Sequence, residues 1–222
     1  MVAKVTQAHI ESRSAAIREA AIHMFARKGI GAATMQDVAA QAGLSAGAIY
    51  RYYPSKDELL RAIFAQLRAE NEALFTQASL GATSPLETLL NTGRVVGERL
   101  RSGSVREANI LQLEAILDDA RRSDGLVAES RQLRRAYLAL TERVLRQAQI
   151  TGGLDPDIDT QGLAIMFLAC MIGVQVLALE VEDAVEMEPV LQVITEMLRR
   201  FAPKPATDDI GLELVSVLKE NR

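Results

Sequence analysis

The stretch Thr34–Lys56, TMQDVAAQAGLSAGAIYRYYPSK, decides the fold of this chain. It predicts a short helix that begins at its first residue, because a threonine followed three residues later by Asp37 forms a capping box. Gly43 ends this helix, since glycine adopts the left-handed backbone that a helix end requires. Ser45 then caps a second helix, expected over residues 46–52. Two helices joined by a glycine turn form a helix-turn-helix, whose second helix enters the major groove of DNA.

The side chains of this stretch suit contacts with DNA. Small residues at the start of the second helix let its backbone approach base edges, and Arg51 can donate two hydrogen bonds to guanine. Lys56 lies at the N-terminus of the next helix, where free backbone amides favour a phosphate. The plainer alternative is a helical hairpin with tyrosines in its core. We expect Gln36, Ala46, Gly47, Ala48 and Arg51 to face bases, and Thr34, Ser45, Tyr50, Tyr52 and Lys56 to contact phosphates.

The segment Arg13–Leu60 resembles the DNA-binding domain of the TetR family of transcriptional regulators. Tyr53 departs from the family's pattern, in which phenylalanine is more common at this position. The resemblance covers about a fifth of the chain and implies a DNA-binding regulator. The residues that carry it are Ile17, Ala20, Ala21, Phe25, Gly29, Thr34, Val38, Ala39, Ala42, Gly43, Leu44, Ser45, Gly47, Ile49, Tyr50, Tyr52, Tyr53, Lys56, Leu59 and Leu60.

Composition and charge agree with a cytoplasmic helical protein. Of 222 residues, 49% are hydrophobic and only 4% are aromatic, which suits helices packed through Leu, Ala, Val and Met. The single cysteine, Cys170, rules out an internal disulfide, and the first residues lack an apolar signal core. The net charge is −4, yet residues 1–60 hold seven basic against five acidic residues. A basic head would face phosphates, whereas the acidic remainder would not.

The rest of the chain has helical periodicity and no convincing strand pattern, so we expect an all-α fold. Residues 1–60 are expected to form a helix-turn-helix DNA-binding domain, and residues 61–222 a helical effector-binding and dimerisation domain. A long helix from Ser55 would belong to both domains and connect them. We expect helices over residues 10–28, 55–78, 85–101, 104–122, 126–149, 163–179 and 185–201, and a short one over 210–218.

The run Leu163–Leu179, LAIMFLACMIGVQVLAL, is apolar except for Gln175. A membrane span is the alternative, but the run is short for one, its flanks are acidic, and no basic cluster sets an orientation. A helix that is apolar all round is otherwise buried on every side. In TetR-like proteins the last two large helices form a four-helix bundle with the partner's copies. We therefore expect a homodimer through this run and Val190–Phe201, no membrane contact, and loss of the dimer in Val174→Asp.

Catalysis has little support in the sequence. The only histidines are His9 and His23, Cys170 lies in an apolar run, and no phosphate loop, nucleophile elbow or metal-ligand pair is present. We therefore expect no enzyme activity, no cofactor and no metal site.

The family resemblance implies instead a small-molecule effector inside the second domain, in a mostly apolar site. Polar residues within apolar helical faces are the candidate anchors, with Glu114 first because apolar neighbours surround it most completely. The alternative is that such groups pair with one another or reach water. The candidate effector-binding residues are Asn71, Phe75, Arg94, Glu114, Tyr137, Thr141, Met166 and Phe167.

The sequence thus favours a homodimeric, cytoplasmic, ligand-responsive transcriptional repressor. A small, mostly apolar effector would release it from a near-palindromic double-stranded DNA operator. Two alternatives stay open, a helical DNA-binding regulator or activator without a ligand, and a helical enzyme with an incidental helix-turn-helix. A filled body core would favour the first alternative, and an isolated active site would favour the second.

Overall fold

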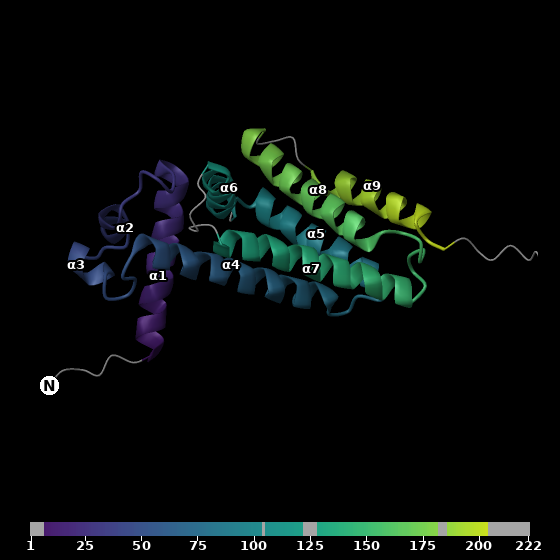
Figure 1. Cartoon of the computed structure of the whole chain (residues 1–222), viewed down its shortest axis with the longest axis horizontal. Coiled ribbons are helices and arrows are strands. Elements are labelled where there is room, and N and C mark those ends of the chain that lie inside the picture. Colours follow the sequence, from purple (N-terminus) through teal and green to yellow (C-terminus); the bar gives the residue numbers. More distant parts are fainter. Residues whose placement is uncertain (1–6, 104, 122–127, 182–185, 204–222) are drawn as a thin grey trace, which may run out of the picture.

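The computed structural model describes residues 7–103, 105–121, 128–181 and 186–203. Every regular element within these ranges is a helix, which confirms the all-α fold. The short helix expected over 210–218 lies outside the described residues. The helices, shown in Figure 1, are α1 (Gln7–Lys28), α2 (Met35–Gln41), α3 (Ala46–Ile49), α4 (Lys56–Ser79), α5 (Pro85–Arg101), α6 (Arg106–Arg121), α7 (Ala128–Ile150), α8 (Thr160–Glu180) and α9 (Met187–Arg200).

Short-range signals explain where these helices begin. The hydroxyls of Ser45, Ser55 and Ser84 each accept a hydrogen bond from the amide three residues on, at the starts of α3, α4 and α5. Thr34 and Asp37 form the complete capping box expected at α2. The helix ends follow from glycine in the same way, since Gly43 after α2 has φ +66°.

Helix α3 is shorter than expected, because it ends at Ile49 rather than near Tyr52. The amides of Arg51 and Tyr52 bond to carbonyls three residues back, at 3.3 and 3.0 Å. Such bonds tighten the last turn of a helix. Arg51 therefore lies in the turn that follows α3, one residue after the helix cap at Tyr50.

Helices α1, α2 and α3 form a head with the first turns of α4, at the purple and blue end of Figure 1. Its core includes Phe25, Val38 and Ile49, which are fully buried. Leu111 of α6 and Leu133 of α7 belong to the same hydrophobic cluster. The packing of the head therefore continues into the rest of the molecule, and the expected division at residue 60 stays a prediction.

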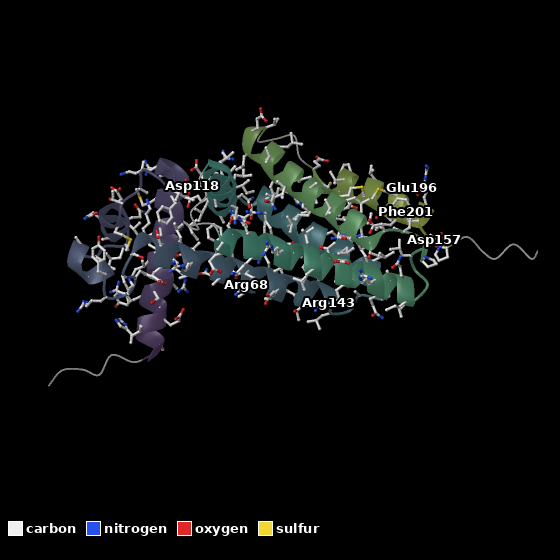
Figure 2. All side chains as sticks on the ribbon, in the orientation of Figure 1. Arg68, Asp118, Arg143, Asp157, Glu196 and Phe201 are labelled. Atoms are coloured by element: carbon white, nitrogen blue, oxygen red, sulfur yellow. The ribbon has the colours of Figure 1, made fainter. Side chains whose placement is uncertain are left out.

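The remaining helices form an elongated body to the right of the head in Figure 1. Helix α4 packs against α5 and α7, α7 against α8, and α5 against α9. At the far end of the body, the amide of Asp155 donates to the carbonyl of Phe201 over 2.8 Å. Figure 2 shows Asp157, in the same loop, beside Phe201 at the end of α9. This bond fixes the α7–α8 loop against the last described helix.

Two glycines let α5 and α9 pack closely. A Cβ added to Gly93 would lie 2.6 Å from Leu191 Cδ2, and one added to Gly97 would lie 2.5 Å from Met187 Cβ. Neighbouring residues at this spacing lie on one face of α5. The contact at residue 97 involves the first side-chain atom of Met187, which cannot rotate away.

Gly97→Val is therefore expected to destabilise the body by about 1–3 kcal/mol, because the added carbons overpack this contact. Chemical denaturation of the full chain measures the change. Glu98→Val is the matched control. It introduces the same branched side chain on the same helix, at a position that is exposed. Equal stabilities of the two variants would contradict the close-packing account.

Helix α8 leaves much of its apolar surface uncovered. It is long and apolar enough to cross a membrane, with a mean hydropathy of 2.4, and only 22% of its most apolar window is buried within the protomer. Ile165 and Leu177 are more than half exposed. Val174 is different, because it is buried against Met187 and Leu191. Val174→Asp would thus disrupt the protomer itself, so it is the wrong substitution for testing a dimer.

Candidate DNA-binding surface and effector cavity

The expected base-facing residues lie on one end of the head, around α3. Gln36, Ala46, Gly47 and Arg51 are exposed, and Ala48 is half-buried. Added carbons at Gly47 would meet nothing within 4 Å, so the front of α3 is open to solvent. A slim helix start with an exposed arginine just beyond it can approach base edges.

The expected phosphate-contacting residues surround this surface. Thr34, Ser45 and Tyr50 are exposed, whereas Tyr52 is half-buried against the head core. Tyr53 serves structure instead, since its hydroxyl donates to the Ser14 carbonyl over 3.3 Å and accepts from Arg18 over 3.1 Å. The turn after α3 is thereby attached to α1, which holds the surface in place.

Lys56 is the exception among the expected phosphate contacts. Its ammonium donates to the carbonyls of Ile30, Gly31 and Ala33, with 3.0 Å to the last. These three acceptors belong to the loop between α1 and α2. In this geometry the ammonium closes the loop, and the expected phosphate contact stays a prediction. Lys56 positions the helix-turn-helix rather than facing outward from it.

Asp37 links the start of α2 to α1. Its carboxylate accepts from Lys28 Nζ at 2.7 Å, and from the Thr34 amide and hydroxyl at 2.9 and 2.8 Å. The hydrogen bond from Lys28, followed by those from Thr34, lowers the pKa of Asp37 to about 2. The charged carboxylate is therefore favoured in the folded head.

This shift predicts an acid-dependent stability. Because the folded pKa of Asp37 lies below its ordinary value of about 4, its contribution is present above that value and is lost as the pH falls toward 2. We expect Asp37→Asn to lower the melting temperature at pH 7, and the difference from wild type to shrink between about pH 4 and 2. Thermal melts across this range measure it, and a difference that persists at pH 2 would contradict the assignment.

An apolar cavity of about 110 Å³ lies inside the body. Helices α4 to α9 all contribute to its walls. Four of the expected effector residues line it, namely Phe75, Tyr137, Thr141 and Phe167. The Tyr137 phenol can donate a hydrogen bond, and burial raises its pKa well above its ordinary value.

The other four expected effector residues lie elsewhere. Arg94 is exposed and donates to Asn91 over 2.8 Å, and Met166 is 42% exposed on α8. Glu114 faces the head, with its carboxylate 3.4 Å from a Cβ built on Gly29. Asn71 lines the adjoining cleft described below. Each was expected from the periodicity of one helix, which does not specify the neighbouring helix that a face meets.

Sequence reasoning missed most of the polar groups around the cavity. Asn109, Gln112, Arg134 and Gln175 line it among apolar side chains. Arg134 donates to Ser130 over 2.9 Å, and Gln112 donates to the carbonyl of Ala108 over 3.3 Å. Asn109 and Gln112 share the face of α6 that carries Leu113 and Ile116, and this spacing was the available signal.

A larger cleft of about 800 Å³ opens between head and body. Helices α1 and α2 form one wall, and α4 to α8 the other. The cleft borders the apolar cavity, and five residues line both spaces. These are Val96, Asn109, Gln112, Tyr137 and Gln175.

Helix α6 contacts both the cavity and the head. Asn109 and Gln112 face the cavity, whereas Leu111 and Ala115 are buried in the head core. At the same junction, Nδ1 of His23 on α1 lies 2.6 Å from Glu107 on α6. In Figure 1, α6 is the helix between α1 and the long body helices. A shift of α6 would therefore move the residues that pack in the head core.

The comparisons with known proteins agree with this arrangement. Residues 17–63 match the family described as bacterial regulatory proteins, tetR family. An uncharacterized HTH-type transcriptional regulator of Bacillus subtilis, YfiR, is 44% identical over 63 residues, which are 28% of this chain and only 31% of YfiR. The HTH-type transcriptional repressor KstR2 of Mycolicibacterium smegmatis is 26% identical over 149 residues, 67% of this chain and 70% of KstR2.

The fold comparison extends over most of the body. The transcriptional regulator FadR from Bacillus subtilis, solved in complex with stearoyl-CoA, superposes with a TM-score of 0.67 at 18% identity, covering 83% of this chain and 96% of FadR. TetR-family proteins are transcriptional regulators rather than enzymes. With a tetR-type helix-turn-helix at residues 17–63 and the all-helical fold of such regulators, the chain belongs to the TetR family of transcriptional regulators.

Proposed function

We propose that this protein is a homodimeric, ligand-responsive transcriptional repressor that acts in the cytoplasm. Two α3 surfaces read a near-palindromic operator, and a small effector bound in the body releases them. The observation that supports this most strongly is the open surface around α3 on a head whose core includes α6. The same helix borders an apolar cavity.

The head is proposed to bind DNA through the exposed residues around α3. Gln36, Ala46, Gly47 and Arg51 would face base edges, with Ala48 at the margin. Thr34, Ser45, Tyr50 and Tyr52 would contact phosphates on either side. The net charge of the chain is −4, whereas residues 1–60 are basic. This distribution supports DNA binding through the head rather than non-specific binding of DNA by the whole surface.

A second copy is proposed to cover the apolar surface of α8 and α9. Ile165, Met166, Val176 and Leu177 are all exposed on α8, and Val193 is exposed on α9. Single exposed apolar side chains are ordinary, whereas a group of them marks an interaction surface. Acidic residues at both ends of α8 disfavour a lipid environment, and α8 already packs along α7. In such a dimer the half-sites would lie about 34–36 Å apart, or a multiple of it.

The effector is proposed to bind in the apolar cavity and the adjoining cleft. The cavity alone is smaller than the roughly 300–1,000 Å³ typical of small-molecule sites, but with the cleft it falls within that range. A ligand there would displace α6, and through it the head. FadR in complex with stearoyl-CoA supports an apolar effector, and the name of KstR2 supports repression.

Selection from a randomised duplex library tests this function. The full-length chain is expected to enrich an inverted repeat with the half-site spacing given above. Enrichment that is salt-sensitive but carries no shared sequence would indicate non-specific binding and would contradict the proposal. A reporter gene placed behind the enriched sequence then distinguishes repression from activation.

A further inference from the structure

One polar group in the apolar cavity lacks a partner. Asn109 is only 4% exposed, and its side-chain amide nitrogen makes no hydrogen bond. Among the described residues it is the sole buried side-chain nitrogen or oxygen in this condition. Leaving a buried donor unsatisfied is unfavourable, so native proteins seldom retain one without a reason.

The position of Asn109 suggests that reason. It is one of the residues shared by the walls of the apolar cavity and of the larger cleft. Of the other polar side chains nearby, Gln112 donates to Ala108 and Arg134 donates to Ser130, and Gln175 is only partly buried. The amide of Asn109 is thus the donor available to a ligand that passes from the cavity into the cleft.

The shape and charge of the two spaces restrict the ligand further. The cavity, about 110 Å³, is small for a fused ring system and suits a short unbranched chain. The cleft presents the carboxylates of Glu19, Glu70 and Glu107 against the guanidinium groups of Arg99 and Arg106. With carboxylates in the majority, the cleft does not favour a polyanionic end group.

We propose that Asn109 is the polar anchor of the effector site and that the effector is an uncharged amphiphile. Its apolar chain occupies the cavity, a carbonyl oxygen accepts a hydrogen bond from Asn109, and its polar end lies in the cleft. This assignment rests on the proposed function, because it identifies the ligand class of the same site. The Tyr137 phenol, which lines both spaces, is a second hydrogen-bond donor at this junction.

A matched pair of probes tests the carbonyl directly. 1-Hexanoylglycerol carries an ester carbonyl between a short apolar chain and an uncharged polar end, and 1-O-hexylglycerol lacks only that carbonyl oxygen. Isothermal titration calorimetry below the micelle concentration should show that the full-length chain binds the ester about tenfold more tightly, as expected for one hydrogen bond to a buried donor. Hexanoyl-CoA should bind more weakly than the glycerol ester, because its end group is polyanionic.

Two variants separate the anchor from general packing. Asn109→Leu keeps the approximate shape but removes the donor, so the ester should lose its tenfold advantage while the unliganded protein melts at a higher temperature. Asn91→Leu changes an amide that lines neither space and should leave the ratio unchanged. Equal binding of the two glycerol probes to wild type, no binding of either, tighter binding of hexanoyl-CoA, or an advantage retained in Asn109→Leu would each overturn the proposal.

Operator binding by the same preparations distinguishes the two levels of the account. If wild type and Asn109→Leu both bind the selected duplex but the ester shows no advantage, the anchor assignment fails while the regulator function stands. If wild type fails to bind any selected duplex, the proposed function fails independently of the probes.

Discussion

Leu177→Asp should separate the dimer into folded monomers and weaken operator binding about 10²- to 10⁴-fold. Leu177 is 51% exposed on α8, so a carboxylate there is tolerated by the protomer but would be buried without a partner in the dimer. The loss of affinity follows because a monomer binds one half-site and forgoes the gain from two linked contacts. Light scattering measures the mass, and titration of the selected duplex measures the affinity.

Leu80→Asp provides the matched control. Leu80 is 75% exposed at the end of α4, away from α8 and α9, and receives the same substitution. It should leave both the mass and the operator affinity unchanged. A stable wild-type monomer at micromolar concentration, or a Leu177→Asp dimer with full affinity, would contradict the proposed interface.

Arg51→Ala should cost about 1–3 kcal/mol per half-site and relax the preference at one base position in each. The exposed guanidinium follows directly after α3, where it can donate two hydrogen bonds to a guanine. Because the side chain is exposed, the fold should be unaffected. Repeating the duplex selection with the variant identifies the position at which preference is lost.

Arg143→Ala removes the same charge from an exposed position on α7, in the body (Figure 2). It should change neither affinity nor base preference by a comparable amount. If Arg51→Ala behaved like this control, the base-reading assignment for Arg51 would be wrong. A uniform loss across all sequences would instead assign Arg51 to phosphate.

The helices were predictable because their boundaries depend on neighbouring residues. Thr34 with Asp37, Ser55, and Ser84 with Pro85 specify helix starts from within a few positions, and the structure has helices at each. The α3 boundary was less accurate, since i to i−3 hydrogen bonds after Ile49 tighten a turn that a longer helix would also accommodate. Local signals therefore give the elements of this chain and most of their ends.

The internal site depends on contacts between helices and was predicted less well. Glu114 has apolar neighbours along α6, but the face that carries it meets the head rather than the cavity. The sequence predicts a phosphate contact for Lys56, whereas in the structure its ammonium donates hydrogen bonds to carbonyls about 25 residues earlier in the chain. The sequence does not single out Asn109, because a polar residue between hydrophobic ones is ordinary in an amphipathic helix. Its importance depends on having no partner in the folded chain.

Hydrogen exchange of the full-length chain, with and without its selected duplex, tests the DNA-reading surface most directly. The account predicts added protection of backbone amides in residues 34–53, with α8 protected equally in both states because dimerisation precedes DNA binding. Protection that appears on α8 and α9 while residues 34–53 exchange as fast as in the free protein would contradict the assignment of the α3 surface.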